Sequence, residues 1–404
     1  MDNTNNSRTL PRITLIMQIV FSISLVIMYT ASNKAFYSKW SDISLVILFV
    51  TAAVFFVITG ITLAKNKTYD PLDLRTDALG LRYSIFFVVC SVVPYILQIV
   101  MLLFVPDAKQ IINEHSSSIA LLFTVINIYV IAFPILLLIT RKIPPVKIKS
   151  QKLGAPMFFL CIAVTAGLCL IGAIIGFVFH IALTTPFSSD ESSTTDIAQI
   201  MMSSSVWERT LVAGILAPVF EELIFRKILI ERTIKYGQTA SMLISGLMFG
   251  LFHGNFQQFF FAFFLGMLFA KIYMITGRIR YSIFLHMIIN LSTSLVTTSL
   301  VIRLMPYMES ASDNFENLPS DVLELFALLG MWILFIGAVA LTGIILFIVF
   351  FKRFKPYKAP DDPPAGQIIR SLIYSPMFLG FMILCLSEFA GTYLPDIIVF
   401  LTNQ

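Results

Sequence analysis

Six polar side chains lie in strongly apolar stretches between positions 221 and 290, and their types could do chemistry. They are Glu221, Glu222, Arg226, His253, His286 and Asn290. Ionisable residues inside a membrane are costly, tend to face one another and mark functional sites. Chance scatter would not place both carboxylates and two of the chain's four histidines within these 70 residues.

Helical spacing separates the two carboxylates into different roles. Glu222 and Arg226 are four residues apart, so they share a helix face and can pair. A paired carboxylate is neutralised and makes a poor base. Glu221 points about 100° away around the helix and is free to face the two histidines. Pro218 precedes it, removes a backbone donor and can kink the helix, which leaves room beside the carboxylate.

The histidines fall in two further pairs with the same spacing. His286 and Asn290 place an imidazole and a carboxamide on one face, and Phe249 packs one turn below His253. A carboxylate with an imidazole can deprotonate water, and a second imidazole with an amide can donate to an oxyanion. That set suffices for amide hydrolysis. Glu221, His253 and His286 could equally hold a zinc ion, so the residue types leave both mechanisms open.

The elements that position these residues are expected to be transmembrane helices. The 404-residue chain is 57% hydrophobic and 13% charged, with a mean hydropathy of +0.87. Apolar runs of about 20 residues, enough to cross a bilayer, recur throughout. We predict an all-α, polytopic transmembrane helix bundle of about eleven spans (range nine to twelve), at 13–31, 43–64, 83–105, 118–140, 157–184, 209–235, 239–253, 256–276, 281–304, 323–351 and 371–393.

Basic residues orient the bundle. A cytoplasmic N-terminus places 23 of the 28 lysines and arginines on the cytoplasmic side, as the positive-inside rule requires. The outer side then holds Lys34, Lys39, Lys109, Arg209 and Arg303. This distribution accounts for the net charge of +5, so no nucleic-acid partner is expected. The four cysteines lie in apolar runs without metal-type spacing and are interpreted as small core residues.

The predicted organisation has four parts. They are five N-terminal spans (1–184), a polar outer loop (185–208), a catalytic core (209–304), and C-terminal helices (305–404) with a Pro-rich linker at 355–366. Glycine pairs at Gly172/Gly176 and Gly246/Gly250 predict close helix packing.

The three pairs of residues resemble a known family. Glu221-Glu222 with Arg226, Phe249 with His253, and His286 with Asn290 are similar to the EExxxR, FxxxH and HxxxN motifs of type II CAAX prenyl endopeptidases, also called the CPBP or Abi family. The resemblance covers about residues 205–305. It implies an intramembrane protease in which the first glutamate and the second motif's histidine activate water. The third motif forms the oxyanion site, and Glu222, Arg226 and Phe249 give structural support.

The resemblance also favours a mechanism without a cofactor over one with zinc. Eukaryotic members cleave the last three residues from prenylated proteins, and bacterial members are tied to bacteriocin immunity or pheromone maturation. We therefore expect a membrane-associated protein or peptide substrate, bacteriocin- or pheromone-like, and membrane lipids as partners. The short N-terminus without eukaryotic sorting signals favours a bacterial plasma membrane.

Two other function classes fit the same residues. A transporter could use Glu221, His253 and His286 as a proton or ion path, although the two halves show no internal repeat. A non-catalytic scaffold or immunity protein would tolerate Glu221→Gln, which keeps the shape of the side chain and removes the base. Motifs of other intramembrane proteases, such as HExxH or a placed GxSx, are absent from the sequence.

Overall fold

A computed structural model describes most of the chain. The described residues are 71–184, 196–308 and 318–357, with positions 311, 315, 364, 367, 378, 380–382, 384–386, 388 and 389. The predicted spans 13–31, 43–64 and 371–393 and the linker 355–366 lie wholly or largely outside these residues. The total of eleven spans and the cytoplasmic N-terminus therefore stay predictions.

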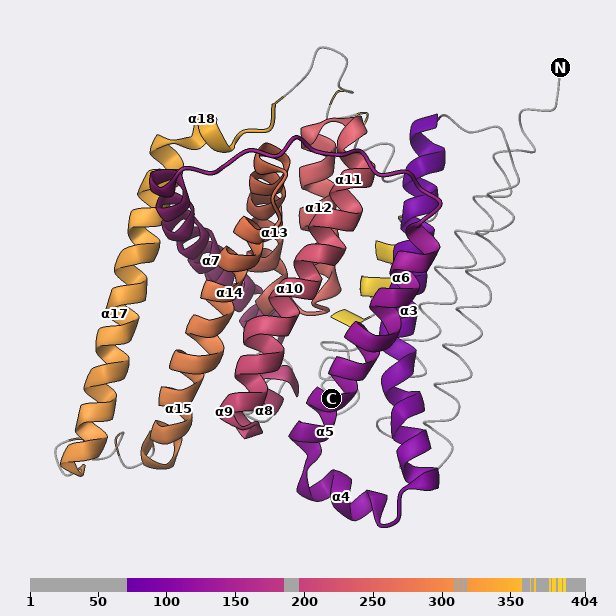
Figure 1. Cartoon of the computed structure of the whole chain (residues 1–404). Helices are drawn as coiled ribbons and strands as arrows, with labels where there is room; N and C mark the ends of the chain where they lie inside the picture. Colours follow the sequence, from indigo (N-terminus) through magenta and orange to yellow (C-terminus); the bar gives the residue numbers. More distant parts are fainter. Residues whose placement is uncertain are drawn as a thin grey trace, which may run out of the picture.

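Every regular element in the described residues is helical, as predicted (Figure 1). The longer helices are α3 (Pro71–Phe104), α7 (Ala155–Thr184), α12 (Gln238–Phe252), α13 (Phe256–Thr276), α14 (Arg280–Leu291) and α17 (Ser320–Val349). The shorter ones are α4 (Ala108–Glu114), α5 (Ser116–Thr124), α6 (Phe133–Thr140), α8 (Asp196–Ser203), α9 (Val206–Arg209), α10 (Ala217–Glu222), α11 (Leu229–Thr233), α15 (Thr298–Leu304) and α18 (Phe351–Phe354). Wider π-helical turns continue several of them, namely η1 (Val125–Ala132), η2 (Thr210–Leu216), η3 (Leu223–Ile228) and η5 (Ser292–Thr297). Two short 3-10 turns are η4 (Ile234–Tyr236) and η6 (Met305–Tyr307).

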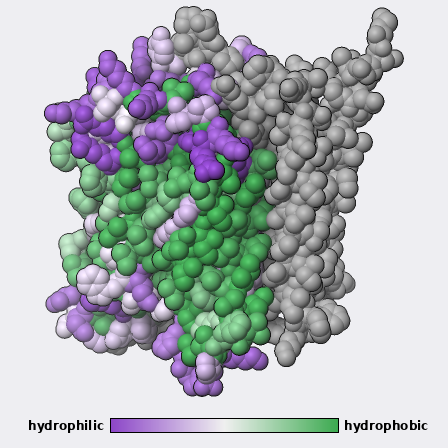
Figure 2. Space-filling model, turned by 45° about the vertical axis from the view of Figure 1, so that its right-hand side comes forward, coloured by the Kyte–Doolittle hydropathy of each residue, from purple (hydrophilic) through white to green (hydrophobic). Residues whose placement is uncertain are grey.

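Six helical segments are long and apolar enough to cross a membrane. They are Leu79–Phe104, Ser116–Thr140, Ala155–Thr184, Phe256–Thr276, Arg280–Tyr307 and Ser320–Val349, and each lies within a few residues of a predicted span. Figure 2 shows the matching surface, a hydrophobic band between hydrophilic ends. The described part of the chain is therefore a helical membrane bundle. Helix α12, with 15 residues, is shorter than a full span.

The predicted polar loop at 185–208 is wrong for its second half. Residues 196–203 form α8, and α9 begins at Val206. The helix α9 starts there because Ser205 and Glu208 make a capping box, each side chain bonding the other's backbone amide. The polar Ser/Thr composition of this segment hides that local start signal.

The loop between α6 and α7 crosses one end of the bundle over several helix ends (Figure 1). We call residues 141–154 the strap. The Val146 amide donates to the carbonyl of Glu231 at 2.6 Å, and the Gln151 amide donates to that of Thr276 at 2.7 Å. The strap thereby holds the ends of α11 and α13, although it has no regular structure of its own.

Helix α13 is the centre of the bundle, with 61% of its most apolar window buried, against 33% or less for the other five segments. Small residues let its neighbours approach closely. Gly172 and Gly176 place α7 against the α13 backbone at Phe261 and Phe256, and Gly246 and Gly250 place α12 against Phe263 and Phe259. Both predicted glycine pairs are therefore packing sites, as expected for helices in lipid.

We expect Gly172→Ala to lower the free energy of unfolding by about 1–3 kcal/mol, the usual cost of overpacking. A Cβ there would collide with the backbone of Phe261. The control is Gly337→Ala on α17, where nothing lies within 4 Å of an added Cβ. Thermal unfolding in detergent measures both, and equal stability of the two variants would contradict this account of the packing.

Candidate active site

One unbroken helical run carries both carboxylates. From Val206 to Thr233 it passes through α9, η2, α10, η3 and α11, so π-helical turns flank the helix with Glu221 and Glu222 on both sides. Pro218 lies in the first turn of α10, where its missing amide is tolerated. Such π-helical turns are frequent at functional sites because they reposition side chains and leave backbone carbonyls without their usual donors.

Side chains from other helices satisfy these carbonyls. The Tyr83 hydroxyl donates to Ile224 O at 2.6 Å, and Ser245 Oγ donates to Phe225 O at 2.8 Å. Asn290 Nδ2 donates to Ala213 O at 2.9 Å. The π-helical turns are thus fixed by α3, α12 and α14, which also fixes the direction of the two glutamates between them.

Glu222 is fully buried and holds two cationic or polar partners. Its Oε2 lies 3.2 Å from Arg226 Nε, so the predicted pair is present. Its Oε1 lies 3.1 Å from His286 Nδ1. Because a carboxylate only accepts, Nδ1 must carry the proton of this bond. Sequence spacing missed this second partner, which orients the imidazole of His286.

Arg226 is also fully buried, and aromatic rings cover it. Its guanidinium carbon lies 4.3 Å from the ring centroid of Phe249 and 5.6 Å from that of Phe269. Its Nη1 and Nη2 atoms have no hydrogen-bond partner among the described residues. The rings therefore supply the contact that these donors lack, through their negative faces. This contact with Arg226 is the one through which Phe249 would give its predicted structural support.

Glu221 differs from its neighbour in exposure. About a fifth of its side chain, 21%, is exposed, whereas Glu222 shows none. Its Oε2 lies 3.6 Å from His286 Nε2, beyond a direct hydrogen bond and close enough for an ionic contact. The imidazole of His286 therefore lies between the two carboxylates, with the buried one fixing the ring and the exposed one at its free nitrogen.

His253 directly follows α12 and lies near Glu221 and His286. Its Nδ1 lies 2.8 Å from Phe249 O, and a carbonyl only accepts, so Nδ1 donates and Nε2 keeps its lone pair. The charge of Glu221 and the ring of His286 both act on it electrostatically. Phe249 packs edge-on against both imidazoles, at 4.9 Å from His253 and 5.7 Å from His286 between ring centroids.

The turn after His253 is held by two residues that sequence reasoning did not single out. Gly254 adopts φ 69°, a left-handed conformation that glycine adopts readily, and the side chain of Glu388 lies against it. Asn255 Nδ2 donates to His253 O at 2.9 Å, and Asn255 Oδ1 caps α13 by accepting from Gln258 N. The asparagine directly before an apolar helix was the available signal, since it is a preferred N-cap residue.

Tyr129 on η1 is a further neighbour of Glu221, and no pattern in the sequence pointed to it. Its ring stacks on Phe220 with centroids 4.3 Å apart, and the charge of Glu221 acts on its hydroxyl. Asn290, predicted as an oxyanion donor, has one amide hydrogen bonded to Ala213 O, and its second remains for another acceptor. The structure thus groups Glu221, Glu222 and His286 closely, with His253 beside them.

The zinc alternative named Glu221, His253 and His286 as ligands. Within the residues that the structure describes, no three histidine, cysteine, aspartate or glutamate side chains form a group with metal-ligand spacing. The Nδ1 atoms of the two histidines are engaged with Glu222 and Phe249, which leaves only their Nε2 atoms for other partners. An Nδ1 bond to a carboxylate or a carbonyl leaves Nε2 available to a metal as well as to water, so zinc stays an alternative to the mechanism without a cofactor.

We expect Arg226→Met to destabilise the fold by about 3–5 kcal/mol, because it leaves the buried Glu222 carboxylate without its cation. Adding Glu222→Gln should recover much of this loss. The control is Lys227→Met, which breaks the partly exposed pair with Glu231 and should cost about 0–1 kcal/mol. Unfolding measurements on the three variants test the coupling, and a double variant no more stable than Arg226→Met would refute it.

Comparison with known proteins places this site within a family domain. Residues 203–292 match the family model described as type II CAAX prenyl endopeptidase Rce1-like. No curated protein and no solved structure matches the chain. The match spans α9 to α14 and includes all three predicted motifs. The resemblance seen in the motifs is therefore confirmed for residues 203–292, which are similar to the type II CAAX prenyl endopeptidase Rce1-like family.

Proposed function

We propose that this protein is an intramembrane endopeptidase that cleaves membrane-associated proteins or peptides. The family match supports a CAAX-type protease at the level of the family. The observation that carries the proposal is the exposed edge of an otherwise buried polar cluster. Glu221 is partly exposed and lies beside the Nε2 atom of His286, while Glu222 and Arg226 are sealed from solvent.

In the proposed reaction, Glu221 and His253 hold a water molecule and take its proton as the oxygen attacks the peptide carbonyl. Both groups have free acceptors, since His253 Nδ1 is engaged and its Nε2 keeps a lone pair. The carbonyl oxygen becomes an oxyanion. The proton then passes to the leaving amine when the carbon–nitrogen bond breaks, which yields an acid and an amine and regenerates the base.

His286 and the second amide hydrogen of Asn290 are proposed to stabilise the oxyanion. With Nδ1–H directed at Glu222, His286 donates from Nε2 only when it carries both ring protons. The two flanking carboxylates then serve as its counter-charges, at 3.1 and 3.6 Å. Glu222 and Arg226 position the ring without touching the substrate, and no cofactor enters this scheme.

The substrate proposal is a bacteriocin- or pheromone-like peptide, or a related membrane protein, in a bacterial plasma membrane. Support comes from His286 and Asn290, which lie on Arg280–Tyr307, a segment long and apolar enough to cross a membrane. A peptide bond that reaches Glu221 must therefore enter from lipid or from a membrane surface.

We expect Glu221→Gln to lower cleavage by about 10²–10⁴-fold, the usual contribution of a general base. New N- and C-termini in membrane and secreted fractions should be compared between wild-type and variant cells at matched expression. The same comparison identifies the substrate.

The matched control is Glu114→Gln, an exposed glutamate on α4 far from the site in sequence. Its peptide ends should equal those of the wild type. Unchanged peptide ends in Glu221→Gln, with any resistance phenotype retained, would replace the protease proposal by the scaffold reading.

A further inference from the structure

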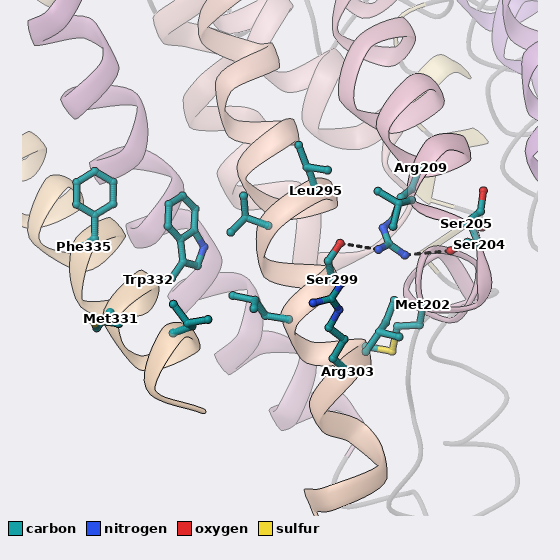
Figure 3. A pocket seen from close by; sticks show the side chains of 15 residues that line it. Met202, Ser204, Ser205, Arg209, Leu295, Ser299, Arg303, Met331, Trp332 and Phe335 are labelled. Atoms are coloured by element: carbon teal, nitrogen blue, oxygen red, sulfur yellow. Dashed lines mark hydrogen bonds between the residues drawn. The ribbon is translucent and has the colours of Figure 1, made fainter. Parts of the chain in front are cut away.

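A second site lies at the end of the bundle away from the strap. A pocket of about 830 Å³ opens between α9, the η5–α15 segment and α17 (Figure 3). It shares no lining residue with the group formed by Glu221, His253 and His286. The pocket is therefore separate from the candidate active site.

Two arginines line one side of this pocket (Figure 3). Arg209 is only 2% exposed, and its guanidinium donates to Ser294 O at 2.8 Å, Ser204 O at 3.0 Å and Ser299 Oγ at 2.6 Å. All three acceptors are neutral. Among the described residues Arg209 forms no ion pair with a carboxylate. Its guanidinium therefore has hydrogen-bond acceptors but no counter-charge there.

Arg303, one turn beyond Ser299, adds a second positive charge at the pocket. It is exposed and likewise forms no ion pair within the described part of the chain. Arg209 and Arg303 are two of only five basic residues predicted on the outer side. The positive-inside rule therefore does not account for two arginines at one pocket on that side. A buried charge without a counter-charge is costly, and a bound anion would remove that cost.

The rest of the pocket is apolar and favours an amphiphile over a small ion. Leu295 faces Met331, Trp332 and Phe335 of α17 across it (Figure 3). Trp332 Nε1 donates to Thr297 Oγ1 at 3.0 Å, which fixes the indole against η5. Met331 and Phe335 remain 58% and 59% exposed, so the apolar wall runs on to the lipid-facing surface of α17. An inorganic anion would leave this wall uncovered.

We propose that this pocket binds an anionic phospholipid, with the phosphate between Arg209 and Arg303 and an acyl chain against Trp332 and Phe335. The lipid would also lie against the helix of the candidate active site. The Ser294 carbonyl accepts from Arg209, and the Ser294 hydroxyl donates to Asn290 O at 2.7 Å.

Tryptophan fluorescence tests this binding directly. The chain has three tryptophans, so Trp40→Phe with Trp207→Phe leaves Trp332 as the only reporter. In phosphatidylcholine vesicles, phosphatidylglycerol with brominated chains should quench Trp332 more strongly than brominated phosphatidylcholine at equal mole fraction. Arg303→Gln should lower this preference about fivefold, the effect of removing one basic group near anionic lipid. The control Lys109→Gln, an exposed lysine on α4, should keep it.

Equal quenching by both lipids, or a preference that survives Arg303→Gln, would overturn the proposal. Loss of the preference on adding inorganic phosphate at constant ionic strength would show a free-anion site and overturn it too. Native mass spectrometry of the protein with all its tryptophans checks the result, because phosphatidylglycerol should stay bound to the wild type and not to Arg303→Gln. Neither measurement needs proteolysis, so the result is independent of the proposed function.

Discussion

The buried carboxylate of Glu222 is the interaction on which the rest of the site depends. One oxygen contacts Arg226 and the other contacts His286, so a single side chain joins the helical run 206–233 to α14. Arg226 in turn lies over Phe249 of α12 and Phe269 of α13. Because charges in a low-dielectric interior must find their partners, this contact leaves the four helical elements little freedom to rotate.

The π-helical turns make that contact compatible with a continuous helix. Each of η2 and η3 leaves carbonyls that side chains of neighbouring helices must satisfy, and Asn290, Tyr83 and Ser245 do so. These hydrogen bonds therefore both satisfy the carbonyls of the π-helical turns and fix the positions of α3, α12 and α14 against the run 206–233. Asn290 contributes to this through one amide hydrogen, which it donates to Ala213 O.

Local spacing predicted the contacts that are local. Glu222 with Arg226 and Phe249 with His253 follow from the geometry of a helix turn, and the apolar run lengths give the six described spans. The bond from His286 to Glu222 joins residues 64 apart in the chain, so it depends on how α14 packs. The π-helical turns also lie outside the 3.6-residue period on which such predictions rest. Glu222 was therefore assigned one partner where it has two.

The unequal burial of the adjacent glutamates explains why one fits a structural role and the other a chemical one. Glu222 has no exposed surface, and its two oxygens lie 3.2 Å from Arg226 Nε and 3.1 Å from His286 Nδ1. Glu221 meets His286 only at 3.6 Å and keeps part of its surface open. Both imidazoles have Nδ1 engaged, by Phe249 and by Glu222, which leaves their Nε2 atoms for a reactant. Burial thus fixes one side of the cluster and leaves the other side partly exposed, as the proposed general base requires.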